Sequence, residues 1–387
     1  MSKFWNDSQL RVLIVSEPGE YGVFYFVEDL IHYLSEQGVH IDFAYSSVRS
    51  GSALKGLVNF VEQNDGKTLN LQITNAPQPR DVSAFIRLRD FVRRRKPDVI
   101  HGHSSKAGVL VRALRMTGVR IPIFYSPHAY YGMGGKQTPM KFLARLTETA
   151  LSSVGKTILG AHSEAHYADE ILGIRPENRM VIPVGVDCQQ FRPAPREVRA
   201  RLRQELGVPE DALLLGTTAR YSLQKDPLTV HWAIRSLLER LPTLWFVHIG
   251  QGELWEEVDA LGDSRRIVRL RSIKWIQDFC KALDGFLLGS RYEGLPRAVL
   301  EAMATNLPLI LTRAPGILDF DDLGLSHVYW AKVGDVRDLA AAIERWASAS
   351  FVGINHREVA LRLFQSERCY RSIHEEYLAT SLPVDQR

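Results

Sequence analysis

Cysteine is scarce in this sequence. The 387 residues include three cysteines, Cys188, Cys280 and Cys369, which lie far apart and form no CxxC pair. Disulfide frameworks and structural zinc sites both need paired or closely spaced ligands, so we expect neither. Scattered thiols of this kind are typical of a protein from a reducing compartment.

Long hydrophobic runs are also missing. No apolar stretch approaches the roughly 20 residues that a membrane-spanning helix needs, and the residues after Met1 do not form the apolar core of a signal peptide. We therefore expect a cytoplasmic protein. Peripheral attachment to the inner face of the plasma membrane stays open.

Two common nucleotide-binding patterns are absent. No Gly-x-Gly-x-x-Gly follows the first predicted strand, which argues against a dehydrogenase. The complete P-loop pattern, Gly-x4-Gly-Lys-Ser/Thr, does not occur either, which argues against a P-loop kinase.

The positive charge is uneven. Residues 1–193 contain 23 Lys+Arg and 18 Asp+Glu, whereas the remainder contains 25 and 26. The basic residues cluster at Arg87, Arg89, residues 93–96, Arg112, Arg115 and Arg120. This cluster is either a solvated helix face or a surface for anionic lipid or a phosphate-bearing acceptor. Nucleic acid is not expected, because a single aromatic residue, Phe91, lies within the basic run at 87–96.

Short β-branched runs alternate with amphipathic helical stretches along the whole chain, which predicts an α/β fold with parallel sheets covered by helices. The first series has predicted strands at 11–16, 41–45, 99–102, 121–125, 156–159 and 180–182, with helices near 23–37, 81–95, 105–117, 138–152 and 163–172. The second has predicted strands at 213–217, 245–249, 267–270, 285–288 and 307–311.

A proline-rich break at residues 191–195 divides the two series. We therefore predict an N-terminal Rossmann-like domain at 1–193 and a C-terminal one at 194–365. A final helix at 366–387 is expected to cross back to the first domain. Ligands of such sheets bind outside the carboxyl ends of the strands, so a cleft between the domains is the expected site.

The most informative stretch is residues 289–304, GSRYEGLPRAVLEAMA. A strand ends, a turn carries Glu293, and Pro296 opens a helix whose N-terminus offers unpaired N–H groups to a phosphate. Glu301 follows inside that helix among apolar neighbours, where a carboxylate needs a partner or a ligand. Two carboxylates eight residues apart could grip a sugar and a ribose that are joined through two phosphates.

This stretch resembles the E-x7-E signature of family 4 glycosyltransferases, which have the GT-B fold. Other segments resemble further motifs of this family, in the same order along the chain: DVIHGH at 98–103, YSPH at 125–128, PVGVD at 183–187, ARYSLQKD at 219–226 and HIGQGE at 248–253. The resemblance covers nearly the whole chain. It implies a GT-B enzyme, two Rossmann-like domains facing a cleft, that transfers a sugar from a nucleotide diphosphate to an acceptor with retention of configuration.

The resemblance also implies roles for individual residues. Arg220 and Lys225 would neutralise the diphosphate that leaves as the glycosidic bond breaks. Glu293 would hold the transferred sugar and Glu301 the ribose. His128 would lie against the sugar near the reacting carbon.

Further contacts follow from the same resemblance. The backbone near Gly294 and Leu295 would touch phosphate or sugar, Gly22 would allow close approach to the ligand, and Ile273 belongs to the loop that binds the base. His103 would orient its loop, and Lys136 and Lys141 could meet an anionic acceptor. No essential metal is expected, because the basic pair can neutralise the leaving group.

Several positions depart from the family pattern. Tyr21 and Ala219 stand where glycines are usual, Asp226 replaces the glycine after Lys225, and residues 269–273 lack the glycine of the base-binding loop. Donor base and sugar are therefore open, with a UDP-sugar favoured over a GDP-sugar. The expected acceptor is a glycan or lipid-linked saccharide of bacterial surface polysaccharide. A sugar-nucleotide 2-epimerase and a catalytically silent GT-B subunit are the alternatives.

Overall fold

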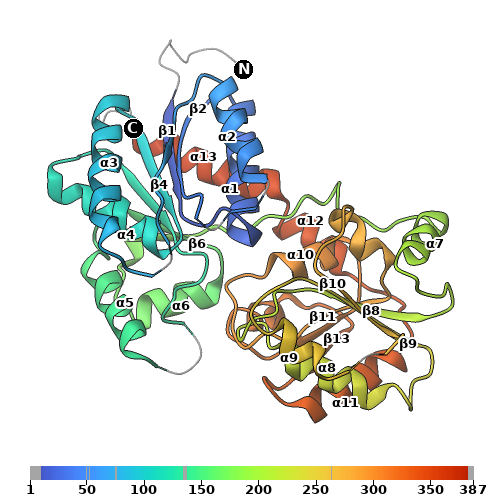
Figure 1. The fold of residues 1–387 in the computed structure, drawn as a ribbon. Coiled ribbons are helices and arrows are strands. Elements are labelled where there is room, and N and C mark those ends of the chain that lie inside the picture. The colour runs from blue at the N-terminus through green and yellow to red at the C-terminus, as the bar shows by residue number, and fades with distance from the viewer. Residues whose placement is uncertain are drawn as a thin grey trace. The chain divides into compact units, whose positions relative to one another are not determined.

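The computed structural model describes residues 10–48, 50–51, 53–74, 76–133, 137–262 and 264–381. Its contacts divide it into two compact units (Figure 1). The first contains the chain up to Gly132, the segment Gln137–Pro183 and the residues from Glu367 onward. The second contains mainly Val184–Ser366. None of the helices in the described residues is long and apolar enough to cross a membrane.

The first unit is built on a seven-stranded parallel sheet of order β3-β2-β1-β4-β5-β6-β7. Its strands are β1 (Arg11–Ser16), β2 (His40–Tyr45), β3 (Thr68–Asn70), β4 (Val99–His103), β5 (Ile123–Ser126), β6 (Lys156–Leu159) and β7 (Arg179–Val181). The strand order reverses between β1 and β4, so a crevice is expected at the carboxyl ends of these two strands.

Helices cover both faces of this sheet because parallel strands need crossover connections. They are α1 (Tyr21–Glu36), α2 (Ala53–Gln63), α3 (Arg80–Arg95), α4 (Ser105–Ala113), α5 (Pro139–Ala150) and α6 (His162–Glu170). Leu88 of α3 and Val111 of α4 share one buried core with Leu13 of β1. Gly38, at φ 79°, follows the end of α1 in the left-handed conformation that glycine tolerates best.

The second unit repeats the architecture with six parallel strands in the order β10-β9-β8-β11-β12-β13. These are β8 (Leu213–Thr218), β9 (Leu244–Ile249), β10 (Ile267–Leu270), β11 (Gly285–Leu288), β12 (Leu309–Thr312) and β13 (Val328–Ala331). The helices are α7 (Arg196–Glu205), α8 (Pro227–Leu237), α9 (Trp255–Asp259), α10 (Arg297–Ala304), α11 (Val336–Ala347) and α12 (His356–Leu363). One apolar core joins α10 and α12 to the sheet. A second core joins α8 and α11 to it.

The doubly wound α/β prediction is confirmed in both units. All eleven predicted strands are present, with ends shifted by two residues or fewer. Strands β3 and β13, each at an edge of its sheet, were not predicted. Apart from the buried Ala331, their residues are only partly buried, so the hydrophobic signal of a central strand is weaker there.

The last helix, α13 (Ser366–Ser381), packs on the first unit, and residues 382–387 of the expected terminal helix lie outside the described part of the chain. Tyr377 of α13 is fully buried, and its hydroxyl lies 2.5 Å from Nδ1 of His101 on β4. The unit boundary falls earlier than the predicted residue 193. Val186, Cys188 and Phe191 belong to the second unit's core, which explains the difference.

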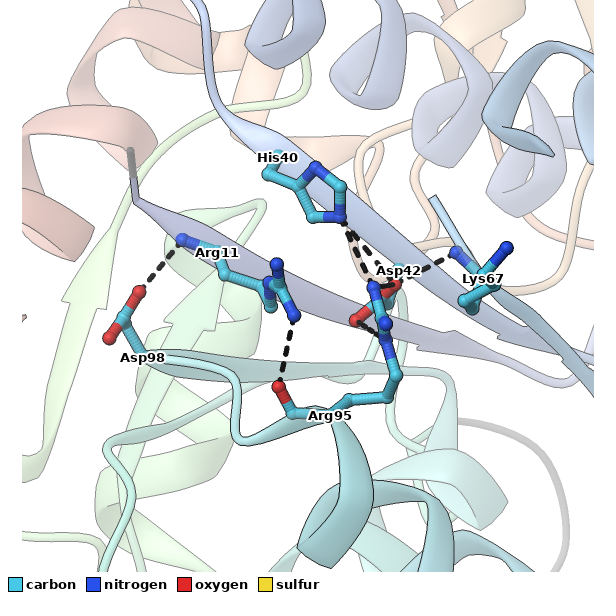
Figure 2. Close-up of polar contacts among 6 residues, drawn as sticks. All are labelled: Arg11, His40, Asp42, Lys67, Arg95 and Asp98. Atoms are coloured by element: carbon cyan, nitrogen blue, oxygen red, sulfur yellow. Dashed lines mark hydrogen bonds and ion pairs between the residues drawn. The ribbon is translucent and has the colours of Figure 1, made fainter. Parts of the chain in front are cut away.

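Part of the basic segment has a structural role. Asp42 on β2 is fully buried and accepts two hydrogen bonds of 2.9 Å from the Arg95 guanidinium and one of 2.8 Å from the Lys67 backbone N–H (Figure 2). Arg11 in turn donates its backbone N–H to Asp98, across 2.8 Å. Arg95 therefore holds the end of α3 against the sheet and is not a free surface cation.

Candidate functional site

A buried carboxylate lies at the carboxyl edge of the second sheet. Glu293 follows β11 and is 5% exposed. Its Oε1 accepts hydrogen bonds from Lys225 Nζ and from Ser290 Oγ, both at 2.5 Å. Lys225 comes from the loop after β8, which pairs directly with β11. The sheet topology thus brings two predicted site residues into an ion pair.

Hydrogen bonds to backbone groups fix the turn that carries Glu293. Gln224 donates its side-chain amide to the Tyr292 carbonyl at 3.0 Å, and its own carbonyl accepts the Arg291 N–H at 2.7 Å. Thr312 Oγ1 donates to the Ser290 carbonyl at 2.6 Å. The loop after β8 and the end of β12 therefore both hold the turn in place.

A glycine turn supports Glu293 from the other side. Gly316 has φ 81°, and a Cβ at this position would lie 2.2 Å from the Gly294 carbonyl oxygen and 2.3 Å from that of Glu293. The N–H of Glu293 donates to the Pro315 carbonyl at 2.9 Å. The residues after Thr312 thus make close backbone contact with the carboxylate turn.

The loop that carries Arg220 rests on a buried histidine pair. Nε2 of His248 lies 2.9 Å from the Ala219 carbonyl, which can only accept, so this nitrogen carries the proton. Nδ1 of His248 then accepts from Nε2 of His231 at 3.0 Å. Burial lowers the pKa of His248 to about 4 and that of His231 to about 2. Both rings are therefore neutral near pH 7.

Two further glycines let the β9 loop approach the Arg220 loop. A Cβ on Gly250 would lie 2.0 Å from the Ala219 carbonyl oxygen, and one on Gly252 would lie 2.4 Å from that of Tyr221. The Arg220 guanidinium itself lies 3.7 Å from the Glu253 carboxylate at the end of this loop. Arg220 thus shares the sheet edge with Lys225, although its ion pair is with Glu253.

Helix α10 carries the second predicted carboxylate. Pro296 directly precedes the helix, as predicted, and Glu301 lies one turn after Arg297, whose Nε is 3.3 Å away. Burial raises the pKa of the Cys280 thiol, and the negative charge of Glu301 raises it further. Gly294 and Leu295 lie in the turn before the helix, and Ile273 packs partly buried against the same core.

The first unit holds a cluster of neutral histidines. Nε2 of His128 lies 3.0 Å from Nδ1 of His103, and burial lowers the pKa of His128 to about 4. His128 and Ala129 both have positive φ, and the buried Glu164 holds this turn by accepting the N–H of Ala129. His103 therefore contacts His128 directly. The sequence predicted only that His103 would orient its own loop.

The structure gives less support for a role of the other predicted residues of the first unit in ligand binding. Gly22 lies in the first turn of α1, and a Cβ there would have open space around it. Lys141 is buried, so it is not placed to meet an acceptor as the sequence analysis suggested. Lys136 lies outside the described residues. Among those that the structure describes, no three His, Cys, Asp or Glu side chains gather as a metal site would require.

Comparisons with known proteins agree with this arrangement. Residues 22–185 match the family described as "Glycosyl transferase 4-like domain", and residues 198–359 match "Glycosyl transferases group 1". The UDP-Gal:alpha-D-GlcNAc-diphosphoundecaprenol alpha-1,3-galactosyltransferase of Escherichia coli is 30% identical over 247 residues. That match spans 61% of this chain and 63% of the relative's length.

The chain belongs to glycosyltransferase family 4. Its fold is GT-B, as predicted, because solved structures of this architecture superpose along nearly the whole chain. Sucrose-phosphate synthase from Thermosynechococcus elongatus does so with a TM-score of 0.77 at 19% identity, over 96% of this chain and 99% of the other. Anabaena HepE in complex with UDP-glucose gives 0.76 at 20% identity, over 96% and 100%.

Sequence reasoning missed several residues of this glycosyltransferase that position the predicted ones. Ser290 and Gln224 both bond to Glu293, the latter at 3.4 Å, and Glu164 holds the His128 turn. Ser290 and Gln224 could have been proposed from position, since one precedes Glu293 by three residues at a strand end and the other adjoins Lys225. Glu164 gave no signal, because it lies 35 residues from the N–H that it accepts.

Proposed function

We propose that this glycosyltransferase moves a sugar from a nucleotide diphosphate, preferentially UDP, to a glycan or lipid-linked saccharide with retention of configuration. The observation that carries the proposal is the Lys225–Glu293 pair at 2.5 Å, at the edge of the sheet where ligands of such folds bind. It provides a cation for phosphate and a carboxylate for sugar hydroxyls in one place.

The charge of each side chain determines the role that we propose for it. Lys225 and Arg220 neutralise the diphosphate as it departs, and N–H groups near Gly294 and Leu295 add donors before α10. Glu293 and Glu301 accept hydrogen bonds from the hydroxyls of the sugar and the ribose. Ile273 contacts the base, and Gly22 leaves room near the ligand. No essential metal is required, because the two cations already balance the leaving group.

His128 is assigned to the sugar being transferred. Its ring is neutral near pH 7 because burial depresses its pKa, so it acts as a hydrogen-bond partner and not as a cation. No aspartate is assigned as a nucleophile. The departing phosphate therefore takes the proton of the acceptor hydroxyl, which attacks from the face that the leaving group vacates.

The acceptor is proposed to be an intermediate of bacterial surface polysaccharide, such as exopolysaccharide, capsule or lipopolysaccharide, assembled on the cytoplasmic side. The galactosyltransferase from Escherichia coli supports this, because its name gives a sugar on diphosphoundecaprenol as its acceptor. HepE supports a UDP-sugar donor, because its structure contains UDP-glucose.

Slow donor hydrolysis tests the proposal without knowledge of the acceptor. The purified chain is incubated with UDP-, GDP- and ADP-sugars, and the released nucleotide and free sugar are followed by NMR. We expect UDP release from at least one UDP-sugar, with the free sugar initially in the donor's anomeric configuration. Interconversion of sugars, as an epimerase would give, or no release from any donor would contradict the proposal.

A further inference from the structure

Helix α5 of the first unit exposes its apolar side chains to solvent. Surface helices normally direct apolar side chains inward and charged ones to solvent. In α5 the apolar side chains point outward: Met140 is 45% exposed, Phe142 60%, and Leu143 and Leu146 52% each. These four residues are here called the α5 outer face.

The inward side of α5 is polar and paired with its neighbours. Glu148 is 6% exposed and accepts hydrogen bonds from Arg112 Nη2 at 2.7 Å and from the Tyr125 hydroxyl at 2.9 Å. Arg112 also stacks over the Tyr125 ring, 4.0 Å from its centroid. These contacts fix the helix in this orientation. The outward apolar side chains are thus a feature of the packed structure, and such a patch marks an interaction surface.

The chain that leads to and carries the α5 outer face is rich in cations, although the following helix, α6, carries the exposed Glu170. Residues 99–147 contain no Asp or Glu, so the nearest acid in sequence is the buried Glu148. Arg115 and Arg120, after α4, are exposed, and Met116 between them is 85% exposed. Helices α3, α4 and α5 lie on the same face of the sheet (Figure 1), and Arg93 and Arg94 in the last turn of α3 are exposed.

We infer that the α5 outer face docks on a membrane surface that contains anionic lipid. An apolar helix face with flanking cations suits the boundary between headgroups and acyl chains, because both interactions are then satisfied together. A symmetric contact with a second copy fits less well, since it would bring two sets of arginines together. The inference goes beyond the proposed sugar transfer and does not depend on it.

Sedimentation with vesicles tests the inference on the full chain. We compare vesicles made from a mixture of phosphatidylcholine and phosphatidylglycerol with vesicles of phosphatidylcholine alone. The double variant Phe142→Ser/Leu146→Ser removes half of the α5 outer face. Trp232→Ser/Val352→Ser is the matched control, since these side chains of the second unit are 51% and 80% exposed.

We expect the wild type and the control to bind the anionic vesicles within twofold of each other, and the α5 variant to bind at least tenfold more weakly. Arg115→Gln/Arg120→Gln should also weaken binding, most strongly at low salt. Equal binding by the α5 variant, no binding by the wild type, or equal binding to neutral vesicles would overturn the inference. A wild-type dimer that the α5 variant converts to monomer would assign the face to self-association instead.

Donor hydrolysis in the absence of vesicles separates this inference from the proposed function. The α5 variant should release nucleotide at the wild-type rate and keep its melting temperature. Failure of hydrolysis in the wild type would contradict the proposed function alone, whereas failure of vesicle binding would contradict only the docking surface.

Discussion

Lys225 and Glu293 lie 68 residues apart in sequence, and their charged atoms lie 2.5 Å apart in the structure. Pairing of β8 with β11 creates this contact, because the two residues leave the sheet at the same edge. Under the proposed function, the pair supplies a cation for the donor phosphate and an anion for the sugar hydroxyls. A donor phosphate would compete with Glu293 for Lys225, while sugar hydroxyls would replace Lys225 at Glu293.

Lys225→Ala should reduce kcat/KM for the donor by about 100-fold or more, because a charge that stabilises the leaving diphosphate is lost. Lys281→Ala is the control, since Lys281 forms an ion pair of the same 2.5 Å length with Asp278 in the same unit. Its kcat/KM should stay within twofold of wild type. Steady-state donor hydrolysis measures both, and similar losses in the two variants would remove Lys225 from the site.

Glu301→Ala should weaken donor binding by about 10- to 100-fold through the loss of hydrogen bonds to a charged acceptor. The fold should remain intact, because the Glu301 side chain is 21% exposed and its ion-pair partner Arg297 is on the same helix. Calorimetric titration with the nucleotide checks this. Glu344→Ala is the control, since Glu344 pairs at 2.7 Å with Arg240 outside its own helix, and it should bind like wild type.

Gly316→Ala should lower both the melting temperature and the donor affinity. The new Cβ would collide with the carbonyls of Glu293 and Gly294, so the carboxylate turn must shift. Gly324→Ala separates the collision from backbone strain, because Gly324 also has positive φ, 63°, but no atom lies within 4 Å of the added Cβ. It should cost about 1 kcal/mol of stability and leave donor affinity unchanged. Unchanged donor affinity in Gly316→Ala would show that the turn tolerates the shift.

Acid should destabilise the second unit through His248. Its pKa is about 4 in the folded chain, below the 6.5 of a histidine side chain in water. The unfolded chain therefore binds a proton that the folded chain does not, and stability falls as the pH drops from about 6.5 to 4. His248→Gln keeps a donor for the Ala219 carbonyl and removes this titration. Its melting temperature should decline less than that of the wild type between pH 7 and 5, and a parallel decline would contradict the assignment.

Tyr377→Phe should destabilise the first unit by about 1–3 kcal/mol, because it leaves the Nδ1 atom of buried His101 without its partner. Tyr370→Phe on the same helix is the comparison. Its hydroxyl lies 3.3 Å from Asp29, a longer contact than the 2.5 Å between Tyr377 and His101. Chemical denaturation should show the larger loss for Tyr377→Phe, and equal losses would argue against a special role for the His101 contact.

Much of the fold could be predicted from sequence because buried parallel strands are continuous apolar runs. The stretch RVLIVS at Arg11–Ser16 is one, and its predicted ends match β1. The edge strand Val328–Ala331 is half-buried except at Ala331 and lacks that signal. The unit boundary was placed late because a proline-rich segment suggested a linker, whereas Phe191 within it is packed into a core.

The candidate site was predictable where the chemistry lies in a local motif. Glu293, Pro296 and Glu301 share one stretch, and the resemblance added Arg220 and Lys225. Contacts between residues that are distant in sequence were not predictable. Thr312 and Ser290 are 22 residues apart, and Tyr377 and His101 are 276 apart. Only strand order and helix packing bring such residues together.

A thermal-shift titration with UDP tests the central claim most directly, because a ligand that binds only the folded state raises the melting temperature to an extent set by its affinity. The account predicts that saturating UDP stabilises the wild type, that Lys225→Ala and Glu301→Ala lose most of this stabilisation, and that Lys281→Ala retains it. Equal stabilisation of all four proteins, or none in the wild type, would contradict the assignment of the donor site to these residues.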